Sequence, residues 1–536
     1  MEEKYDAIVI GSGIGGLTTA ALLAKAYGQK VLVLEQHWTL GGLTHEFERK
    51  TKQATYSWDV GVHYIGYIKE GDLMTDIYDY ISNGKLEWKK IKDPFDTFWY
   101  PDFRFGVSSD LKQYKQELCT LFPEEKKAIL RYFKHVKAAA NWSAYWFLKE
   151  TLPRPLSWLM ALLKKSKQAF FMQTTQVYLD KNFKDAKLKA LLSSQWGDYA
   201  TIPNESAFWG HCMIVNHYST GGFYPKGGSK TIAKSLVPTI EAAGGKCFTN
   251  CTVNEILIEN GKAIGCTYRV QEQGKWIEKT VHANKVISSI GARNTFRKLL
   301  RNPIHPELDE LKHGHSAMTI YLGLKDNPEK KLGVTGGNFW LFDHYRHNDF
   351  IKNENIAEDP AQFCFLSFPS LKDPSRKAHT AEIVAFSQYK SFEQWKDTEW
   401  QDRGEAYEAY KAKVAERYIA FVEKRFPGFK DLVDYVEVSS PLSLQKFTQR
   451  PKGAIYGLDL SKKRFELDCL NAQTSIPNLY LSGSDVMIMG VTGAAFGGAI
   501  AAAKIGSKLG AISLIAKIKI DNQKRKKQGK SMKIYS

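Results

Sequence analysis

The chain has 536 residues, of which 43% are hydrophobic and 25% charged. This is the composition of an ordinary globular protein, and it excludes the disordered, collagen-like and disulfide-stapled classes. Lys and Arg outnumber Asp and Glu by 75 to 57, which gives a formal net charge of +18 and points to a polyanionic partner. No zinc finger, RNP motif or KH loop is recognisable, so we expect an anionic membrane surface as that partner and no nucleic acid.

The N-terminus and the cysteines indicate in which cellular compartment we expect the protein. The chain enters an apolar strand directly after Asp6, which leaves no room for the charged, apolar and cleavage regions of a signal peptide. The seven cysteines form no Cys-x-x-Cys pair and stand beside no histidines at metal-ligand spacing. We therefore expect reduced thiols, no metal site, and a cytoplasmic protein without a signal peptide.

A strand, a glycine-rich turn, a helix and a second strand open the chain. Residues 6–10 read as a short buried-type strand, residues 17–27 are rich in Ala and Leu, and residues 31–34 form a second apolar run. This order predicts a Rossmann-type dinucleotide site, because the turn lets the backbone approach the pyrophosphate and the helix N-terminus offers free N–H groups. An acid at the end of the second strand would bind the adenosine ribose. The expected contacts are Gly11, Ser12, Gly13, Gly15 and Gly16 for the phosphates, and Glu35 with its neighbour Gln36 for the ribose.

Further glycines follow the ribose acid. Gly41 and Gly42 form a second pair, and Gly61 stands in the run WDVGVHYIG at 58–66. A second close approach of the backbone suits the longer FAD molecule better than NAD. Ordinary turns are the alternative reading of these glycines.

The C-terminal region repeats the strand-to-helix pattern. Residues 478–485 read as a strand that ends in Gly483 and Asp485, and a run rich in Gly and Ala begins at Val491. The carboxylate at the strand end is expected to face the ribitol, while the N-terminus of the following helix points at the flavin ring. The Gly and Ala of this run are too weakly apolar for a transmembrane helix.

Motifs at both ends and in the middle of the chain carry a family resemblance. They are GSGIGG at 11–16, WDVGVHYIG at 58–66, PNESAFWGHCMIVNHYSTGGFYPKGG at 203–228, AIYGLDL at 454–460 and IPNLYLSGSD at 476–485. With them the chain resembles the retinol saturase family and, more distantly, carotenoid isomerases and phytoene desaturases. The resemblance implies an α/β fold of the amine-oxidase-like two-domain type, with non-covalently bound FAD and a conjugated polyene, retinoid or carotenoid-like, as substrate.

The same resemblance divides the chain into interleaved segments. It implies a Rossmann-type FAD-binding domain and an α+β substrate domain, and it places the backbone at Val253 against the adenine. The FAD-binding segments are expected at 1–105, 225–295 and 450–510, the substrate segments at 106–224 and 296–449, and a basic tail at 511–536. No second strand–GxGxxG–helix unit is evident, so NAD(P)H is possible as an electron donor only without a Rossmann domain of its own.

Saturation of a carbon–carbon double bond needs hydride from a reduced flavin and a proton from a weak acid. The expected candidates for the catalytic groups are His63, Tyr64, His217, Tyr218 and Tyr224, with Lys226 at the flavin edge as a stabiliser of its reduced anion. Each of them alone is read equally well as a packing or hydrogen-bonding residue.

Other activities suit the same residues. A cis–trans isomerase and a desaturase would use the same scaffold, so the sequence leaves the reaction open. A non-enzymatic prenyl or lipid carrier of the Rab GDP-dissociation inhibitor type is the alternative of another class. The complete glycine turn, Glu35 and Asp485 argue against a carrier, which has no need of a ribose acid.

Two segments bear on the membrane. Aromatic, leucine and lysine residues alternate between Trp142 and Tyr178, which suits either an interfacial amphipathic helix or a core helix of the substrate domain. Residues 517–536 hold eight Lys or Arg and one acid, Asp521. We expect this tail to be solvated or to touch anionic lipid, which makes the protein peripherally membrane-associated.

Overall fold

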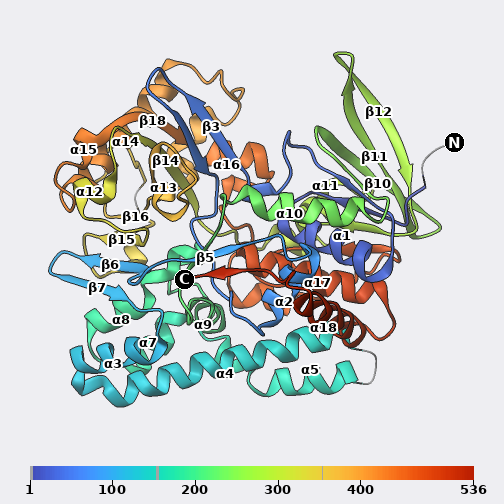
Figure 1. Ribbon diagram of the computed structural model, residues 1–536, viewed down its shortest axis with the longest axis horizontal. Helices are drawn as coiled ribbons and strands as arrows, with labels where there is room; N and C mark the ends of the chain where they lie inside the picture. Colours follow the sequence, from blue (N-terminus) through green and yellow to red (C-terminus); the bar gives the residue numbers. More distant parts are fainter. Residues whose placement is uncertain (1–3, 153–155, 353) are drawn as a thin grey trace.

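Two large β-sheets, three smaller ones and a layer of helices make up the computed structural model, which describes residues 4–152, 156–352 and 354–536 (Figure 1). Part of the predicted amphipathic stretch, residues 153–155, lies outside the described residues. The seven-stranded sheet lies at the left of Figure 1, and the strands and helices of the dinucleotide-type fold lie at the right.

The first sheet has five parallel strands in the order β19-β13-β1-β2-β9. Its central strands are short and wholly apolar, as expected for parallel strands that are covered on both faces. Helices α1, α10 and α17 pack together on one face, and an antiparallel meander, β10–β12, covers the other. The strands are β1 (Ala7–Ile10), β2 (Val31–Leu34), β9 (Lys246–Phe248), β13 (Val286–Ser288) and β19 (Leu479–Leu481), and the covering elements are α1 (Ile14–Tyr27), α10 (Lys230–Glu241), α17 (Gly490–Gly506), β10 (Cys251–Glu259), β11 (Lys262–Glu272) and β12 (Lys275–His282).

Glycines set how closely α1, β19 and α17 approach. A Cβ atom at Gly15 would lie 2.3 Å from the Cα of Gly483, just after β19. A Cβ at Gly498 of α17 would lie 2.4 Å from the carbonyl oxygen of Gly15, and one at Gly497 would lie 2.0 Å from the carbonyl oxygen of Gly483. Because real Cβ atoms do not approach other atoms so closely, only glycine fits at these positions. The Gly- and Ala-rich composition of α17 is therefore a packing requirement.

The second sheet has seven strands in the order β18-β14-β17-β16-β15-β6-β7, all antiparallel except the β15–β6 pair. Side chains alternate along its strands: Phe339 and Leu341 pack toward α14 (Glu405–Glu423), and Trp340 packs toward the helical layer. The strands are β6 (Asp96–Tyr100), β7 (Phe103–Val107), β14 (Ser316–Leu324), β15 (Asn338–Phe342), β16 (Phe363–Ser367), β17 (His379–Ser387) and β18 (Val433–Ser439).

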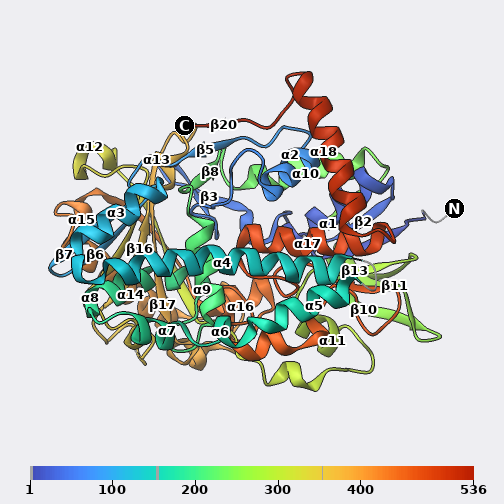
Figure 2. The same cartoon turned by 90° about the horizontal axis from the view of Figure 1, so that it is seen from below.

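Helix α4 (Lys126–Thr151) connects the two sheet regions. It contacts α3, α5 and α9 of the helical layer and also α17 of the dinucleotide region, and it runs along the length of the molecule in Figure 2. The other helices of this layer are α3 (Leu111–Leu121), α5 (Leu156–Ser166), α6 (Gln168–Phe171), α7 (Thr175–Asn182), α8 (Ala186–Ser193) and α9 (Phe208–His217). The remaining elements are α2 (Leu73–Ile81), α11 (Ala292–Lys298), α12 (Pro328–Leu332), α13 (Pro369–Lys372), α15 (Phe429–Leu432), α16 (Pro441–Thr448), β3 (Glu46–Lys50), β4 (Thr55–Asp59), β5 (Trp88–Lys90) and β8 (Phe223–Pro225).

The strands of the two large sheets come from different parts of the chain. All five strands of the parallel sheet fall in the segments 1–105, 225–295 and 450–510. In contrast, β6 and most of β7 lie at the end of the first segment but belong to the seven-stranded sheet. The crossing from one sheet to the other therefore precedes residue 96.

The C-terminal residues are folded against the rest of the protein and do not form the predicted separate tail. Their lysines are exposed to solvent, and the expected contact with anionic lipid stays a prediction. Helix α18 (Ala511–Lys527) packs on α2 and α17, and β20 (Ile534–Tyr535) pairs with β5. The guanidinium of Arg525 is 8% exposed and donates two hydrogen bonds, of 3.0 and 2.9 Å, to the carboxylate of Asp79 on α2. The sequence pattern missed this pairing because the two residues are 446 positions apart.

None of the described helices is by itself long and apolar enough to span a membrane. Helices α17 and α18 reach the required length and composition only as a pair, and the chain bends by 109° between them.

Arg525 should be important for stability. Replacing it by Met, written Arg525→Met, leaves the Asp79 carboxylate buried without its partner, and we expect the free energy of unfolding to fall by about 3 kcal/mol. Lys524→Met, at the exposed neighbouring position, should change it by less than about 0.5 kcal/mol. Denaturant titration of both variants measures the difference. Equal stability of the two variants would show that α18 does not contribute to the folded core.

Candidate active site

Two cavities meet at the junction of the two halves of the molecule. The larger, of about 480 Å³, is a cleft along the carboxyl ends of β1, β2, β13 and β19, the edge at which parallel α/β sheets bind their ligands. The second, of about 310 Å³, lies between the 58–66 motif, α4 and α9. Five residues line both cavities: Gly61, Val62, Tyr456, Gly490 and Val491. A molecule in the second cavity thus lies against the end of one bound in the cleft.

The glycine turn shapes the floor of the cleft. A Cβ atom at Gly13 would meet no protein atom within 4 Å, so this residue faces the open space of the cleft. A Cβ at Gly16 would instead lie 2.2 Å from the carbonyl oxygen of Gly11, so this glycine serves helix-on-strand packing. Helix α1 begins after Gly13 without a side-chain cap, and its first N–H groups are available to an anion. The turn therefore fits a pyrophosphate.

Glu35 is held rigidly at the end of β2. Its Oε2 accepts hydrogen bonds from the backbone N–H and the hydroxyl of Ser12, at 2.8 and 2.7 Å, and its Oε1 accepts one from the N–H of His37 at 2.8 Å. The side chain is 7% exposed and lines the cleft. These donors hold a carboxylate in the position that a ribose hydroxyl requires.

Most of the other predicted cofactor residues also line the cleft. Asp485 lies at its edge, and its Oδ2 accepts a hydrogen bond of 2.8 Å from the N–H of Ala292, at the start of α11. Ser12 and Gly16 lie behind the surface rather than in it. The predicted residues that line the cleft are Gly11, Gly13, Gly15, Glu35, Gln36, Gly41, Gly42, Gly61, Val253, Gly483, Asp485 and Val491.

Sequence reasoning missed the basic residues of the cleft, among them Arg293, His313 and Arg450. Arg450 donates a hydrogen bond from Nη1 to the carbonyl oxygen of Ile455, and burial lowers the pKa of its guanidinium. Arg293 lies on α11, and the other two lie in loops of the 290–315 and 447–458 regions, which carry no phosphate-binding motif. Only the fold brings them to the dinucleotide cleft.

The second cavity is lined mostly by apolar side chains. Helix α4 contributes Ala140, Ala144 and Phe147, and α9 contributes Met213 and Ile214. Four of the six predicted catalytic residues also line it: His63, Tyr64, His217 and Tyr218. The sequence motifs thus converge on one apolar chamber with a few polar groups, the usual character of a small-molecule site.

His63 contacts two buried charged side chains, those of Glu382 and Lys372. Its Nδ1 lies 2.9 Å from Oε2 of Glu382, a wholly buried carboxylate whose pKa is raised by desolvation. The ammonium of Lys372 donates to the carbonyl oxygen of His63 at 2.6 Å and to Asn338 and Ser367. Burial lowers the pKa of Lys372 to about 8. His63 is therefore positioned from both its side chain and its backbone.

His217 is fixed as a neutral ring. Its Nε2 accepts a hydrogen bond of 2.7 Å from the backbone N–H of Gly66, so that nitrogen carries no proton. Burial lowers the pKa of His217 to about 3. The imidazole therefore orders the 58–66 motif against α9, and it is not a cationic acid at neutral pH.

Tyr64 lies between two carboxyl groups. Its hydroxyl oxygen is 2.9 Å from Oδ2 of Asp96 and 3.0 Å from Oδ2 of Asp198, and the ring of Tyr218 stacks on its own ring with centroids 4.4 Å apart. Asp198 and both tyrosines line the apolar cavity. The two aspartates were missed by sequence analysis because they lie 32 and 134 positions from Tyr64, in no shared motif.

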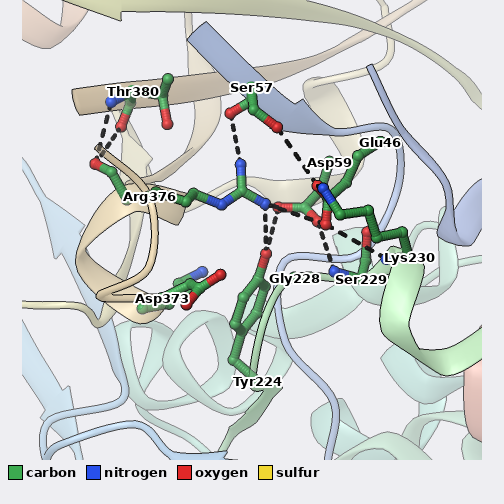
Figure 3. A network of polar contacts seen from close by, with 12 residues as sticks. Glu46, Ser57, Asp59, Tyr224, Gly228, Ser229, Lys230, Asp373, Arg376 and Thr380 are labelled. Carbon is green, nitrogen blue, oxygen red and sulfur yellow. Dashed lines mark hydrogen bonds and ion pairs between the residues drawn. The ribbon is translucent and has the colours of Figure 1, made fainter. Parts of the chain in front are cut away.

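Tyr224 does not reach either cavity. Its hydroxyl donates to Oδ2 of Asp59 at 2.6 Å and accepts from Nη2 of Arg376 at 2.9 Å. Figure 3 shows the Arg376 guanidinium between Ser57, Asp59 and Tyr224, with Glu46 and Lys230 beyond. Tyr224 is thus part of a buried ionic network, and the geometry gives it a structural position instead of the predicted catalytic one.

Lys226 also lies outside both cavities. Its side chain is half exposed, pairs with Glu87 at 3.0 Å, and stands over the ring of Tyr535 at 4.6 Å. The geometry therefore gives no support to its predicted place at the flavin edge. Strand β8 directs the side chain of Lys226 to the C-terminal strand β20 through its pairing with β5.

One group of side chains in the described part of the chain has metal-like spacing. The ligand atoms of His305, Glu307 and Cys469 lie within 4.8 Å of one another. The imidazole of His305 already hydrogen-bonds Glu307 at 2.9 Å, and none of the three lines either cavity. The group has no role in the active site.

Comparison with known proteins decides the family. Residues 9–81 match the family model described as an NAD(P)-binding Rossmann-like domain. An all-trans-retinol 13,14-reductase from Danio rerio is 34% identical, over 98% of this chain and 90% of its own length. This chain belongs to the all-trans-retinol 13,14-reductase family. The resemblance predicted from the motifs is thereby confirmed.

More distant proteins place this reductase family in a wider group. Prolycopene isomerase 2, chloroplastic, from an Oncidium hybrid cultivar is 29% identical, over 95% of this chain and 85% of its own length. The structure of cyclohexylamine oxidase from Brevibacterium oxydans covers 96% of this chain and 100% of its own, with a TM-score of 0.58 at 14% identity. The predicted α/β, Rossmann-type and amine-oxidase-like fold is confirmed, and the chain is an enzyme of the oxidoreductase class. Nothing in these comparisons supports the alternative of a non-enzymatic carrier.

Two glycines of the turn should separate binding from folding. Gly13 has φ −56° and ψ 163°, a conformation that alanine adopts freely, so Gly13→Ala should leave the melting temperature unchanged. Its methyl group would enter the cleft, and we expect the amount of dinucleotide bound per protein to fall. Gly15→Ala would place a methyl group against the backbone of Gly483, and we expect the free energy of unfolding to fall by about 1–3 kcal/mol. Cofactor absorbance per protein and thermal melting report the two effects. Full dinucleotide occupancy in Gly13→Ala would contradict the place assigned to the phosphates.

Proposed function

We propose that this enzyme uses non-covalently bound FAD to reduce a carbon–carbon double bond of a conjugated polyene, retinoid or carotenoid-like. The observation that carries the proposal is the contact of the dinucleotide cleft with the apolar cavity at Gly61, Val62, Tyr456 and 490–491. Because these residues line both spaces, the proposal places the cofactor's reactive end and the apolar substrate against one shared lining.

The shape of the cleft favours FAD over a shorter dinucleotide. The cleft extends from Val253 on β10, past Glu35 and the glycine turn, to the N-terminus of α17. A Cβ atom at Gly42 would lie 3.1 Å from the Cα of Gly13, so the second glycine pair lets its backbone pack closely beside the turn, where both line the cleft. Glu35 would hold the ribose, the N-terminus of α1 the pyrophosphate, and the N-terminus of α17 would face the ring. When bound, the flavin supplies hydride exchange.

The cavity favours an elongated apolar substrate. Its walls are aliphatic and aromatic side chains of α4 and α9, and its polar groups gather at one side around Tyr64 and Asp198. Such a chamber suits a polyene that presents one double bond to the cofactor. The names of the relatives, a retinol reductase and a prolycopene isomerase, describe substrates of this kind. Isomerisation and desaturation are the alternative reactions of the same site, and NAD(P)H would act as a diffusible electron donor.

The reaction is tested by reducing the bound flavin anaerobically and adding retinol, a carotenoid or a polyunsaturated lipid. We expect reoxidation of the flavin together with a product heavier by two hydrogens. An isomer of unchanged mass would establish isomerisation in its place. A protein purified without flavin absorbance, and unable to bind added FAD, would contradict the proposed cofactor.

We also propose that the protein attaches to a membrane, with α5 as the docking face in place of the C-terminal tail expected from the sequence. A Cβ atom at Gly510, between α17 and α18, would lie 1.7 Å from the carbonyl oxygen of Thr151, so this corner lies against the end of α4. Helix α5 packs beside α4 on the outside of the molecule (Figure 2). Large apolar side chains are exposed along α5 and at the corner: Leu156, Trp158, Leu159, Leu162, Leu509 and Ile512.

Charge identifies the proposed occupant of this face as an anionic bilayer. Lys165, Lys167 and Lys508 are exposed beside the apolar side chains. Apolar insertion with flanking lysines is typical of interfacial helices, and anionic lipid is concentrated on the cytoplasmic leaflet. Helix α4 separates α5 from the apolar cavity, so lipid at this face would lie one helix away from the substrate site.

The double variant Trp158→Ser with Leu159→Ser should bind anionic vesicles at least about tenfold more weakly, because two large apolar side chains no longer enter the interface. Trp276→Ser is the matched control, since Trp276 is 62% exposed on the distant strand β12. Vesicle co-sedimentation at two salt concentrations measures both variants. Equal binding by the double variant and the wild type would exclude α5 as the docking face.

A further inference from the structure

We propose that Asp198 is the proton donor of this site, and that Tyr64 and Asp96 keep the proton on it. The inference rests on the proposed function, because it assigns a group to the carbon that does not receive hydride. It names a residue that lies outside every motif singled out in the sequence.

The count of protons around Tyr64 requires a protonated carboxyl group. The phenol oxygen lies within hydrogen-bonding distance of both Asp96 and Asp198, but it carries only one proton to donate. Two ionised carboxylates would leave one contact as oxygen against oxygen with no hydrogen between them. One aspartate therefore carries a proton and donates it to the phenol oxygen.

The surroundings of the two aspartates show which one is protonated. Asp96 accepts further hydrogen bonds, from the amide of Gln195 at 3.0 Å and the amide of Asn338 at 3.2 Å, and both stabilise a carboxylate. For Asp198 the contact with Tyr64 is the only hydrogen bond of the side chain among the described residues. A carboxyl group with a single polar partner in an apolar cavity is stabilised as the neutral acid.

The electrostatic surroundings agree with this assignment. The ionisable groups that face Asp198 are Asp96, Tyr64, Tyr218 and Tyr456, and none of them carries a positive charge. Burial first, and repulsion by Asp96 second, raise the pKa of Asp198 well above its usual value. Burial also raises the pKa of Asp96, to about 7, against the hydrogen bonds that lower it.

The position of Asp198 suits proton transfer. Its carboxyl group lines the same cavity as Tyr456, which borders the dinucleotide cleft. A bound, reduced flavin would supply hydride to one alkene carbon, while the O–H bond of Asp198 breaks and its proton joins the other carbon. The Tyr64 hydroxyl then turns its proton to the new carboxylate, and water entering after product release restores the acid. In a desaturation the same groups act in the reverse direction.

The alternative donors have other commitments. Nε2 of His217 accepts a backbone N–H, and Tyr224 and Lys226 lie outside the cavity. His63 lines the cavity but is held against Glu382. Asp198 therefore has what these four of the six sequence-derived candidates lack, a proton in the cavity with no stronger partner.

Asp198→Asn tests the proposal, because it keeps the size of the side chain and removes the acid. We expect normal folding, normal flavin content and polyene binding, with the rate of polyene reduction lowered at least about 100-fold. Asp459→Asn is the matched control, since Asp459 is buried and lines neither cavity. Its rate should equal that of the wild type.

A second measurement does not depend on turnover. The infrared spectrum of the purified enzyme at pH 7 should contain the absorption of a protonated carboxyl group that disappears in Asp198→Asn and shifts in Tyr64→Phe. If this absorption remains in Asp198→Asn, another residue carries the proton and the proposal is wrong. If it disappears but no polyene is reduced by the wild type, the proposed function fails while the protonation of Asp198 stands.

The rate of polyene reduction should depend on pH through the protonation of Asp198. An acid with a raised pKa is protonated below that pKa, so the wild-type rate constant for polyene reduction should be constant at low pH and fall as pH rises through it. In Asp198→Asn the residual rate should lose this decline. A variant rate within threefold of the wild type, or an unchanged alkaline decline, would overturn the assignment.

Discussion

Backbone-to-backbone packing of α1, the end of β19 and α17 is the constraint on which the site depends. Gly15, Gly483 and Gly498 bring three segments, from opposite ends of the chain, closer than any side chain would allow. This packing places the N-terminus of α17 beside the cleft that the first glycine turn forms. Because no residue larger than glycine fits at these positions, the distance between the glycine turn and the far end of the cleft is fixed.

A buried ionic network gives the second half of the site its position. Arg376 follows α13 in the seven-stranded region, whereas Asp59 ends β4 and Tyr224 lies on β8. Desolvation alone would make such a cluster costly, but the arginine is satisfied by Asp59, Tyr224, Ser57 and the nearby Glu46. The network directs the 58–66 motif toward α9 and so forms one wall of the apolar cavity. Tyr224 contributes to this network and lines neither cavity.

Few polar groups enter the apolar cavity, and each is held in one state by its neighbours. His217 is neutral because burial opposes its charge and a backbone N–H occupies its Nε2. His63 is held from both sides by Glu382 and Lys372. The two aspartates on either side of Tyr64 differ in two respects: Asp96 is wholly buried and accepts two further hydrogen bonds, whereas Asp198 lines the cavity and contacts Tyr64 alone. In a low-dielectric site this small difference is enough to separate a carboxylate from a carboxylic acid.

The sequence by itself determined the dinucleotide half of this protein. The glycine turn at 11–16, Glu35 and the Gly483–Asp485 strand end were predictable because each depends on backbone geometry over a few consecutive residues. Only the tertiary structure decided the position of Lys226, the fold of the C-terminal helix and the meeting of Asp96, Tyr64 and Asp198. These depend on contacts between residues separated by tens to hundreds of positions, and no local pattern records which charge will be buried beside which. The proposed membrane face depends on tertiary structure for the same reason, because the basic residues at 517–536 belong to a folded helix and strand, while the exposed apolar side chains of α5 lie beside α4.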